Sequence, residues 1–279
     1  MDGKRIEWYI REYICRNGVC EKTKFPLVIG GDLSAHAVTD KRRLRRAEKN
    51  ATEAKNEAAR TANNNFFTGR DFLLTATLSD EGLEELIAKA GTDDPDALVL
   101  RLRKDAGNWI RRAKRKMPEG TELKYMAWVS DLDGKRLTPA RPHLHVVVNA
   151  EGAQALAETW KAGYVYGLDR NLYSANHGDL TDLVEYLMAQ SRTVGTEKRY
   201  VPSRNLEKPE VSRLRPARNP DAPLSIPKDA RLILKSEQRA GRPQKVRYYR
   251  ESKDRRPGIV GSTSSVSADG AATFPASGE

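Results

Sequence analysis

The chain has few of the residues that small secreted or metal-clipped proteins depend on. Among 279 residues there are only two cysteines and four histidines. Cys15 and Cys20 lie close together in "CRNGVC", and no second cysteine pair exists to complete a four-ligand zinc site. This composition excludes a disulfide framework, and we expect both thiols to be reduced.

Long apolar runs are also missing. No stretch approaches the roughly 20 consecutive apolar residues that a membrane-spanning helix needs. The first residues, "MDGKRIEWYIREY", are charged where a signal peptide would be apolar. We therefore expect a cytoplasmic protein with no membrane partner.

Acidic residues are fewer than basic residues. Lys and Arg number 49 against 38 Asp and Glu, which gives a formal net charge of +11. Much of the basic charge lies in three segments, 41–60, 101–116 and 192–218. Each segment alone is compatible with an ordinary solvated surface, but together they favour a polyanionic partner such as a nucleic acid.

Two of these basic segments have helical patterns. Segment 41–60 is rich in alanine and carries eight Lys or Arg against three Glu, which predicts a helix. Segment 101–116 carries eight basic residues against Asp105 alone, and its apolar residues recur at helical spacing. Segment 192–218 mixes its charges with Pro, Ser and Gly and is expected to be a loop.

Short strands alternate with helices in the rest of the chain. We expect strands at 71–78, 123–130, 143–149 and 164–168, and helices at 80–90, 153–163 and 180–190, the helix 153–163 being stopped at Gly163. This order predicts an α+β fold with an antiparallel β-sheet and flanking helices. The predicted organisation is an N-terminal basic and helical extension at 1–62, a main domain at 63–252, and a disordered tail at 253–279, where large apolar residues are nearly absent.

Two of the four histidines stand one residue apart in "RPHLHVVVN", residues 141–149. Side chains alternate along a strand, so His143 and His145 share one face with Val147. Two neutral imidazoles side by side provide two corners of a metal site, which a carboxylate or water would complete. The spacing also arises by chance, so a structural role for the pair stays open.

Several enzyme classes contain such a pair. A histidine-triad hydrolase needs a third histidine where Val147 stands, and a cupin needs a glutamate within the strand, whereas Glu151 follows its predicted end. A third class uses a tyrosine nucleophile. Tyr186 lies on the predicted helix 180–190, about 60° from the centre of its apolar face. It is either that nucleophile or a boundary tyrosine with a half-buried ring.

Five segments together resemble the rolling-circle replication initiators of the HUH endonuclease superfamily, most closely the filamentous-phage gene II type. The resemblance covers roughly residues 60–210. The matching segments are "NFFTGRDFLLTATL", "RPHLHVVVN", "WKAGYVYGL", "LVEYLMAQSR" and "KRYVPSRNLEKP". Their agreement in order and spacing is more specific than any single motif.

The resemblance implies a fold, a reaction and a cofactor. It implies the HUH core, with ferredoxin-like or RRM-like topology, and site-specific nicking of single-stranded DNA at a replication origin. Tyr186 would attack the phosphodiester, form a 5′-phosphotyrosine and later rejoin strands. His143 and His145 would bind Mg²⁺ or Mn²⁺, and a host helicase and polymerase would act with the protein.

The sequence departs from the family pattern at two places. A lysine commonly stands three residues after the tyrosine, but Ala189 occupies that position and Gln190 follows it. The usual third metal ligand, a glutamate near the end of the preceding strand, is missing. Asp131 in "SDLDGK" is the replacement we predict, and a turn-forming role for it is the alternative. Asp182 stands where a two-tyrosine enzyme would place its second tyrosine, so Tyr186 is the one nucleophile that fits the family pattern. Less favoured candidates are Tyr164, Tyr166, Tyr173 and Tyr200.

The basic segments would then hold single-stranded DNA. Phosphate contacts are expected from six side chains: Arg111, Arg112, Lys114, Arg199, Arg204 and Lys208. Tyr200 is expected to stack on a base. Three alternatives share some of these features: a relaxase or single-strand transposase with the same chemistry, a DNA-binding protein whose nuclease site has decayed, and a small-molecule metallohydrolase.

Overall fold

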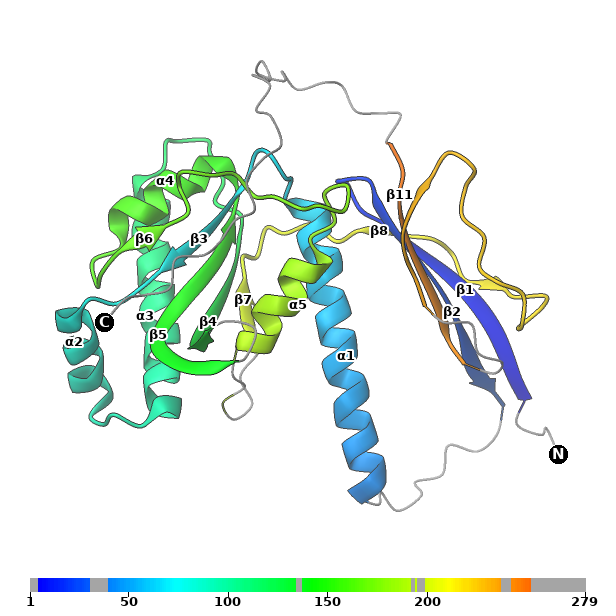
Figure 1. Ribbon diagram of the computed structural model, residues 1–279, viewed down its shortest axis with the longest axis horizontal. Coiled ribbons are helices and arrows are strands. Elements are labelled where there is room, and N and C mark those ends of the chain that lie inside the picture. The colour runs from blue at the N-terminus through cyan, green and yellow to red at the C-terminus, as the bar shows by residue number, and fades with distance from the viewer. Residues whose placement is uncertain are drawn as a thin grey trace.

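The structure is a computed structural model that describes residues 5–30, 40–133, 137–191, 194, 199–236 and 242–251. The predicted tail 253–279 lies outside the described residues, as does most of 192–198. The fold is α+β, with two antiparallel β-sheets and five helices in the described part of the chain (Figure 1). No helix among the described residues is both long enough and apolar enough to span a membrane.

The first sheet has five strands in the order β6-β3-β5-β4-β7. Their bounds are β6 Val165–Tyr166, β3 Phe72–Ala76, β5 Thr138–Val148, β4 Tyr125–Asp133 and β7 Tyr200–Pro202. The central strand β5 alternates as predicted, because Leu144, Val146 and Val148 join one apolar cluster while Val147 joins the other. The sheet is thus buried on both faces.

Different helices cover the two faces of this sheet. On one face pack α3 (Pro95–Lys116) and α4 (Ala150–Thr159), with α2 (Asp80–Ala90) against α3. On the other face pack α5 (Thr181–Gln190) and the second half of α1 (Asp40–Asn65). The helix predicted at 153–163 ends earlier, at Thr159. A Cβ on Gly163 would lie 2.3 Å from the Thr77 carbonyl oxygen, so Gly163 allows a close passage beside β3 rather than ending the helix.

The second sheet combines the two ends of the chain. Its order is β10-β11-β2-β1-β8, with β9 also paired to β1. The strands are β1 Arg5–Ile14, β2 Val19–Ile29, β8 Glu210–Val211, β9 Arg215–Pro216, β10 Arg231–Lys235 and β11 Gln244–Tyr249. Both cysteines, Cys15 and Cys20, are free and buried at the turn of the β1–β2 hairpin.

This second sheet differs from the predicted N-terminal extension at 1–62. The helix predicted at 41–60 is present as α1, but residues 5–29 are a β-hairpin, and the predicted boundary at residue 62 falls inside α1. The hairpin was missed because its partner strand β11 lies more than two hundred residues away in sequence and charged residues interrupt its alternation. Segment 192–218 has no helix in its described part, as predicted, but it contributes β7, β8 and β9.

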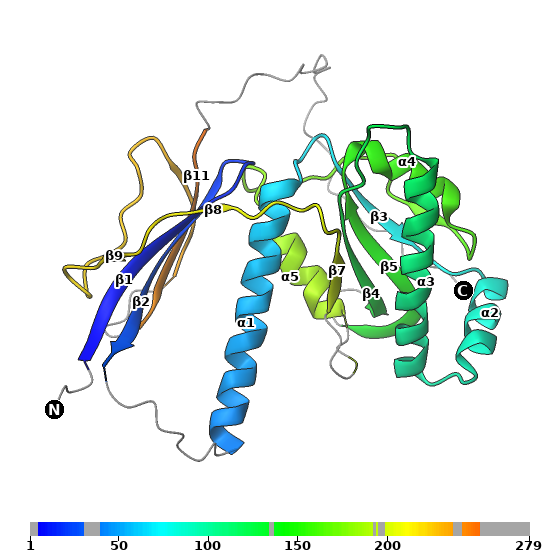
Figure 2. The same cartoon turned by 180° about the vertical axis from the view of Figure 1, so that it is seen from behind.

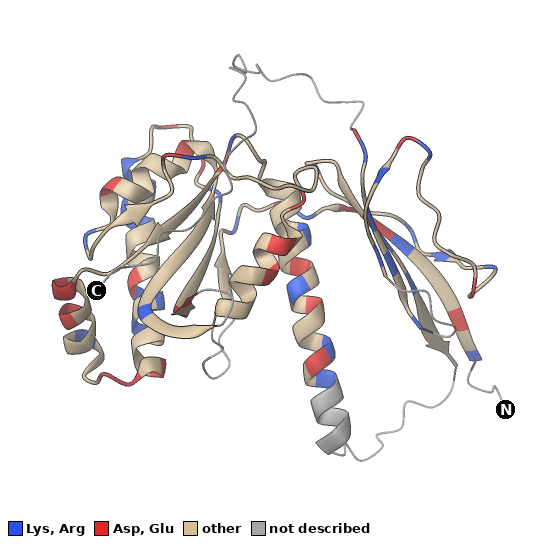
Figure 3. Ribbon diagram, in the orientation of Figure 1, with Lys and Arg blue, Asp and Glu red and all other residues tan. Residues whose placement is uncertain are grey.

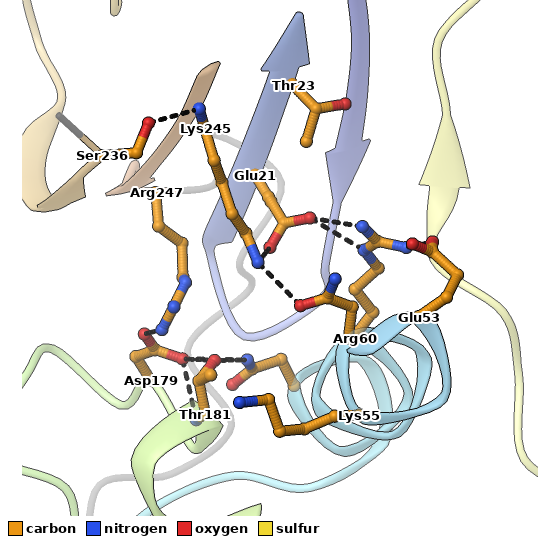
Figure 4. A network of polar contacts seen from close by, with 12 residues as sticks. Glu21, Thr23, Glu53, Lys55, Arg60, Asp179, Thr181, Ser236, Lys245 and Arg247 are labelled. Atoms are coloured by element: carbon orange, nitrogen blue, oxygen red, sulfur yellow. Dashed lines mark hydrogen bonds and ion pairs between the residues drawn. The ribbon is translucent and has the colours of Figure 1, made fainter. Parts of the chain in front are cut away.

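A buried polar network joins the second sheet to α1 and to the start of α5, and α1 lies between the two sheets in both views (Figures 1 and 2). Glu21 on β2 accepts a hydrogen bond from Arg60 Nε of α1 at 3.0 Å and pairs with Lys245 Nζ at 2.7 Å. Arg247 on β11 pairs with Asp179 at 2.5 Å, and both side chains are almost fully buried (Figure 4).

Asp179 fixes the start of α5. Its Oδ1 accepts hydrogen bonds from the Thr181 backbone N–H at 3.0 Å and from Asn63 Nδ2 at 2.9 Å. The N-cap residue itself, Leu180, offers no side-chain cap. The carboxylate therefore satisfies an N-terminal amide of α5 while Arg247 neutralises its charge, so the last described strand helps to position α5.

Replacing Arg247 by Ala is expected to destabilise the protein by about 3–5 kcal/mol, because Asp179 would be left as a buried, unpaired charge. The measurement is the free energy of unfolding from urea denaturation. The matched control is Arg250→Ala, which removes an exposed pair with Asp229 and is expected to cost less than about 1 kcal/mol. Equal losses for the two variants would contradict a structural role for the Arg247–Asp179 pair.

Candidate active site

The two histidines lie on the sheet face that α5 covers. His145 is paired in register with Thr75 of β3 and Trp128 of β4, and His143 with Ser130 of β4. Trp128 and Val147, on the same face, belong to the apolar cluster that contains α5. The pleat of β5 therefore turns both imidazoles toward the helix that carries Tyr186.

The ring nitrogens of the pair converge. The Nε2 atoms of His143 and His145 are 3.1 Å apart, with the ring planes at 90°. The Nδ1 atom of His143 donates to the Arg141 carbonyl oxygen at 2.9 Å, which leaves Nε2 of that ring as the atom with the lone pair. The Thr75 hydroxyl lies 3.1 Å from Nδ1 of His145. A backbone carbonyl group and a hydroxyl group thus orient the two rings through their Nδ1 atoms.

This geometry fits a divalent metal ion. Two nitrogens bound at about 2.1 Å to one ion, with a right angle between them, lie about 3 Å apart. Metal-binding histidines typically donate their other N–H to a carbonyl or hydroxyl group, as His143 does here. His143, His145 and an oxygen ligand would hold such an ion.

Gln190 is the candidate for that oxygen and was not identified as a site residue from the sequence. Its side chain is almost fully buried at the end of α5 and interacts with His145. Its Oε1 atom is buried, and its contact with His145 raises the pKa of that ring, as an oxygen that accepts from the protonated imidazole does. A buried amide oxygen beside two imidazoles is also of the type that binds a divalent cation. The signal for it was the spacing of four from Tyr186, which puts both side chains on one face of a helix.

Gln190 also touches the predicted nucleophile. Its Nε2 atom donates a hydrogen bond to the Tyr186 hydroxyl oxygen at 2.7 Å. Tyr186 is 39 % exposed, so its oxygen meets both the amide and solvent. Asp182, one turn earlier, bonds to Asn176 instead. The chain thus places Tyr186, Gln190 and the histidine pair in one connected group.

Asp131 does not join this group. It is buried at a bulge of β4 between Ser130 and Leu132. Within the described ranges, no three side chains of the His, Cys, Asp and Glu types are gathered to hold a metal ion. The aspartate whose charge acts on His145 is Asp133, two residues further along the strand.

His145 has a strongly lowered pKa. Burial, which removes the imidazole from water, and the neighbouring His143 together lower its pKa from the usual 6.5 to about 4. Asp133 and Gln190 oppose this shift only in part. The ring is therefore neutral, the form that binds metals, throughout the physiological pH range.

The predicted DNA-binding residues on helix 101–116 lie on the other side of the sheet. Arg111, Arg112 and Lys114 belong to α3, whose buried residues pack on the face opposite the histidines. Figure 3 shows basic residues along this helix, away from α5. The structure therefore does not bring these three residues together with Tyr186.

The residues predicted from loop 192–218 are spread along β7 and beyond. Arg199 donates to the Met188 carbonyl oxygen at 3.2 Å, which places its charge at the C-terminal end of α5. Arg204 is exposed near Tyr125, and Lys208 lines a cavity beside the second sheet. Tyr200, expected to stack on a base, stacks on Trp128 with ring centroids 5.7 Å apart. Of the basic side chains in this set, Arg199 contacts the tyrosine helix, and Tyr200 packs against the apolar cluster that contains α5.

The sequence matches no model of a protein family, and neither a curated protein nor a solved structure is similar to it. The membership expected from the five motifs thus stays a prediction.

The lowered pKa of His145 makes stability depend on pH. Between pH 6.5 and 4 the unfolded chain binds a proton at this residue and the folded chain does not, so stability falls as the pH is lowered through this window. The loss attributable to His145 is on the order of 3 kcal/mol. Urea unfolding in EDTA at a series of pH values is expected to show a shallower decline for His145→Gln than for the wild-type chain. Parallel curves would rule out a neutral buried His145.

Proposed function

We propose that this protein is a metal-dependent endonuclease that nicks single-stranded DNA through Tyr186, as an initiator of rolling-circle replication. The observation that carries the proposal is the continuous group formed by Tyr186, Gln190, His145 and His143. A phenol next to a divalent-ion site is the arrangement needed to attack a phosphodiester and keep its energy in a covalent bond. The net charge of +11 and the motif resemblance to HUH replication initiators support a DNA substrate.

Tyr186 would be the attacking group. Its oxygen forms a bond to phosphorus and the bond between phosphorus and the 3′ oxygen breaks. The phenolic proton passes to water, and water protonates the leaving 3′ oxygen. The products are a 5′-phosphotyrosine and a free 3′-OH. The Gln190 N–H already points at the phenolic oxygen, and a hydrogen bond to a charged oxygen is stronger than one to a neutral oxygen. The amide therefore stabilises the oxygen as it loses its proton.

His143, His145 and Gln190 Oε1 would hold Mg²⁺ or Mn²⁺. The ion would neutralise the non-bridging oxygens of the phosphate and so lower the barrier for attack by an oxygen nucleophile. Ala189 leaves no cation three residues after the tyrosine, and Arg199, which donates to the Met188 carbonyl oxygen, supplies a positive charge at the end of α5. In the reverse direction, a 3′-OH attacks the phosphotyrosine and rejoins the strand.

A relaxase or a single-strand transposase would use the same residues and chemistry. These roles differ in the type of mobile DNA that encodes the protein and in the DNA sequence that is cut. Covalent attachment through Tyr186 is common to all of them.

Replacing Tyr186 by Phe is expected to abolish covalent attachment to DNA, because the phenolic oxygen forms the bond. The protein is incubated with Mn²⁺ and labelled single-stranded DNA tiled from the replicon that encodes it, and a denaturing gel is examined for a protein-linked fragment. Tyr164→Phe, an exposed tyrosine outside α5, is the control and is expected to keep the adduct. Nicking that survives in Tyr186→Phe would exclude Tyr186 as the nucleophile. DNA binding without an adduct in the wild-type protein, under any divalent metal, would favour a decayed nuclease.

Two variants of Gln190 separate its two contacts. Gln190→Ala removes the oxygen ligand and the N–H donor, so Mn²⁺ affinity is expected to fall by about tenfold and adduct formation to fall as well. Gln190→Glu keeps an oxygen and adds a negative charge, but it has no N–H to donate to Tyr186. It is therefore expected to bind Mn²⁺ at least as tightly as the wild type and yet to form the adduct more slowly.

Calorimetric titration with Mn²⁺ and the rate of adduct formation are the two measurements. Unchanged Mn²⁺ affinity in Gln190→Ala would exclude Gln190 as a ligand. An unchanged adduct rate in Gln190→Glu would exclude the N–H contact as a contribution to the reaction.

A further inference from the structure

A groove lies directly beside the histidine pair, between β3, β6, the turn 167–173 and α5. Its volume is about 720 Å³. Its lining includes Leu73 and Thr75 of β3, Tyr166 of β6, Tyr173 and Leu183 of α5. The lining is mainly apolar, and polar side chains of the turn contribute to it.

The groove is continuous with the candidate active site through a row of paired residues. Tyr166 is the register partner of Thr75, and Thr75 is the register partner of His145. Adjacent strands lie about 4.8 Å apart, so the Cα atoms of Tyr166 and His145 are separated by about 10 Å. On the other side of the groove, Leu183 precedes Tyr186 by three residues and lies on a neighbouring part of the helix surface.

The two tyrosines of the groove are unusually open to solvent. Tyr166 is 59 % exposed and Tyr173 is 80 % exposed. An aromatic ring that is exposed beside an apolar groove gives no packing energy to the fold, but it offers a flat surface to a ligand. Aromatic rings of this kind stack on bases in proteins that bind single-stranded nucleic acids.

We propose that this groove binds a nucleobase of the substrate strand, next to the phosphate that Tyr186 attacks, with Tyr166 and Tyr173 as its stacking surfaces. The inference rests on the proposed function, since the nicking site supplies the strand that passes the groove. A base has two apolar faces for the rings and a polar edge for the polar side chains Asp169, Arg170 and Asn171, which also line the groove. Holding that base would fix the position of the adjoining phosphate relative to the histidines. The groove then contributes to the choice of the nicking position.

The first test is binding in the absence of metal, so that it does not depend on nicking. Affinity for fluorescent oligo(dT) is measured by anisotropy in EDTA. Tyr166→Ala is expected to weaken binding by about tenfold, as loss of one stacked base predicts. Tyr166→Phe keeps the ring and is expected to bind like the wild type. The matched control is Tyr164→Ala, since Tyr164 is 63 % exposed two residues away and does not line the groove.

The second test locates the contact. An oligonucleotide with 5-iodouracil in place of thymine is irradiated in complex with the full chain, and the crosslinked peptide is identified by mass spectrometry. Crosslinks to Tyr166 or Tyr173 are expected. Crosslinks only elsewhere, or equal losses of affinity in Tyr164→Ala and Tyr166→Ala, would overturn the proposal. So would unchanged affinity in Tyr166→Ala, which would leave the groove to an apolar peptide or another ligand.

The two proposals fail in distinguishable ways. Crosslinks to the groove without any covalent adduct at Tyr186 would retain base binding and reject nicking. An adduct at Tyr186 without crosslinks to the groove and without an effect of Tyr166→Ala would retain nicking and reject the base site.

Discussion

The register of β5 between β3 and β4 is the constraint on which the candidate site depends. A slip by one residue would turn His143 and His145 to the face covered by α3 and α4 and would bury Leu144 and Val146 under α5. The apolar residues that alternate with the histidines prevent this slip, because they fill the cluster on the opposite face. The register also places the Thr75 hydroxyl group beside Nδ1 of His145, and Tyr166 on the edge strand β6. Packing of the core therefore sets the geometry of the polar site.

The second constraint is the attachment of α5. Its residues Val184, Leu187 and Met188 pack against the sheet, and Asp179 ties its first turn to Asn63 of α1 and to Arg247 of β11. A helix of ten residues has little stability of its own, so these contacts determine where Tyr186 and Gln190 lie. The second sheet, which is built from both ends of the chain, thereby contributes to the site without supplying a residue to it.

Local patterns predicted most of the first sheet and its helices. Helix α2 has the predicted bounds, because Ser79 caps its start and Gly91 its end. The strand alternation of β5 also gave the correct face for His143 and His145. The pairing of β2 with β11 could not be predicted, since it joins segments at opposite ends of the chain and no local period encodes such a contact. For the same reason, the sequence could not show that α3 lies on the face away from Tyr186, or that β4 has a bulge at Asp131.

Gln190 illustrates why a site residue can be hidden in a sequence. An amide at the end of an apolar helix has an ordinary appearance. Its proposed role depends on two contacts, one of Nε2 with the Tyr186 hydroxyl group and one of the side chain with His145. A lysine reaching the same place would add a positive charge beside two imidazoles and oppose the binding of a cation there. A neutral amide avoids that repulsion while still donating to the phenolic oxygen. In the proposed enzyme, the absence of a cation at Ala189 is therefore consistent with a site in which the metal ion and Arg199 carry the positive charge and Gln190 links nucleophile to metal.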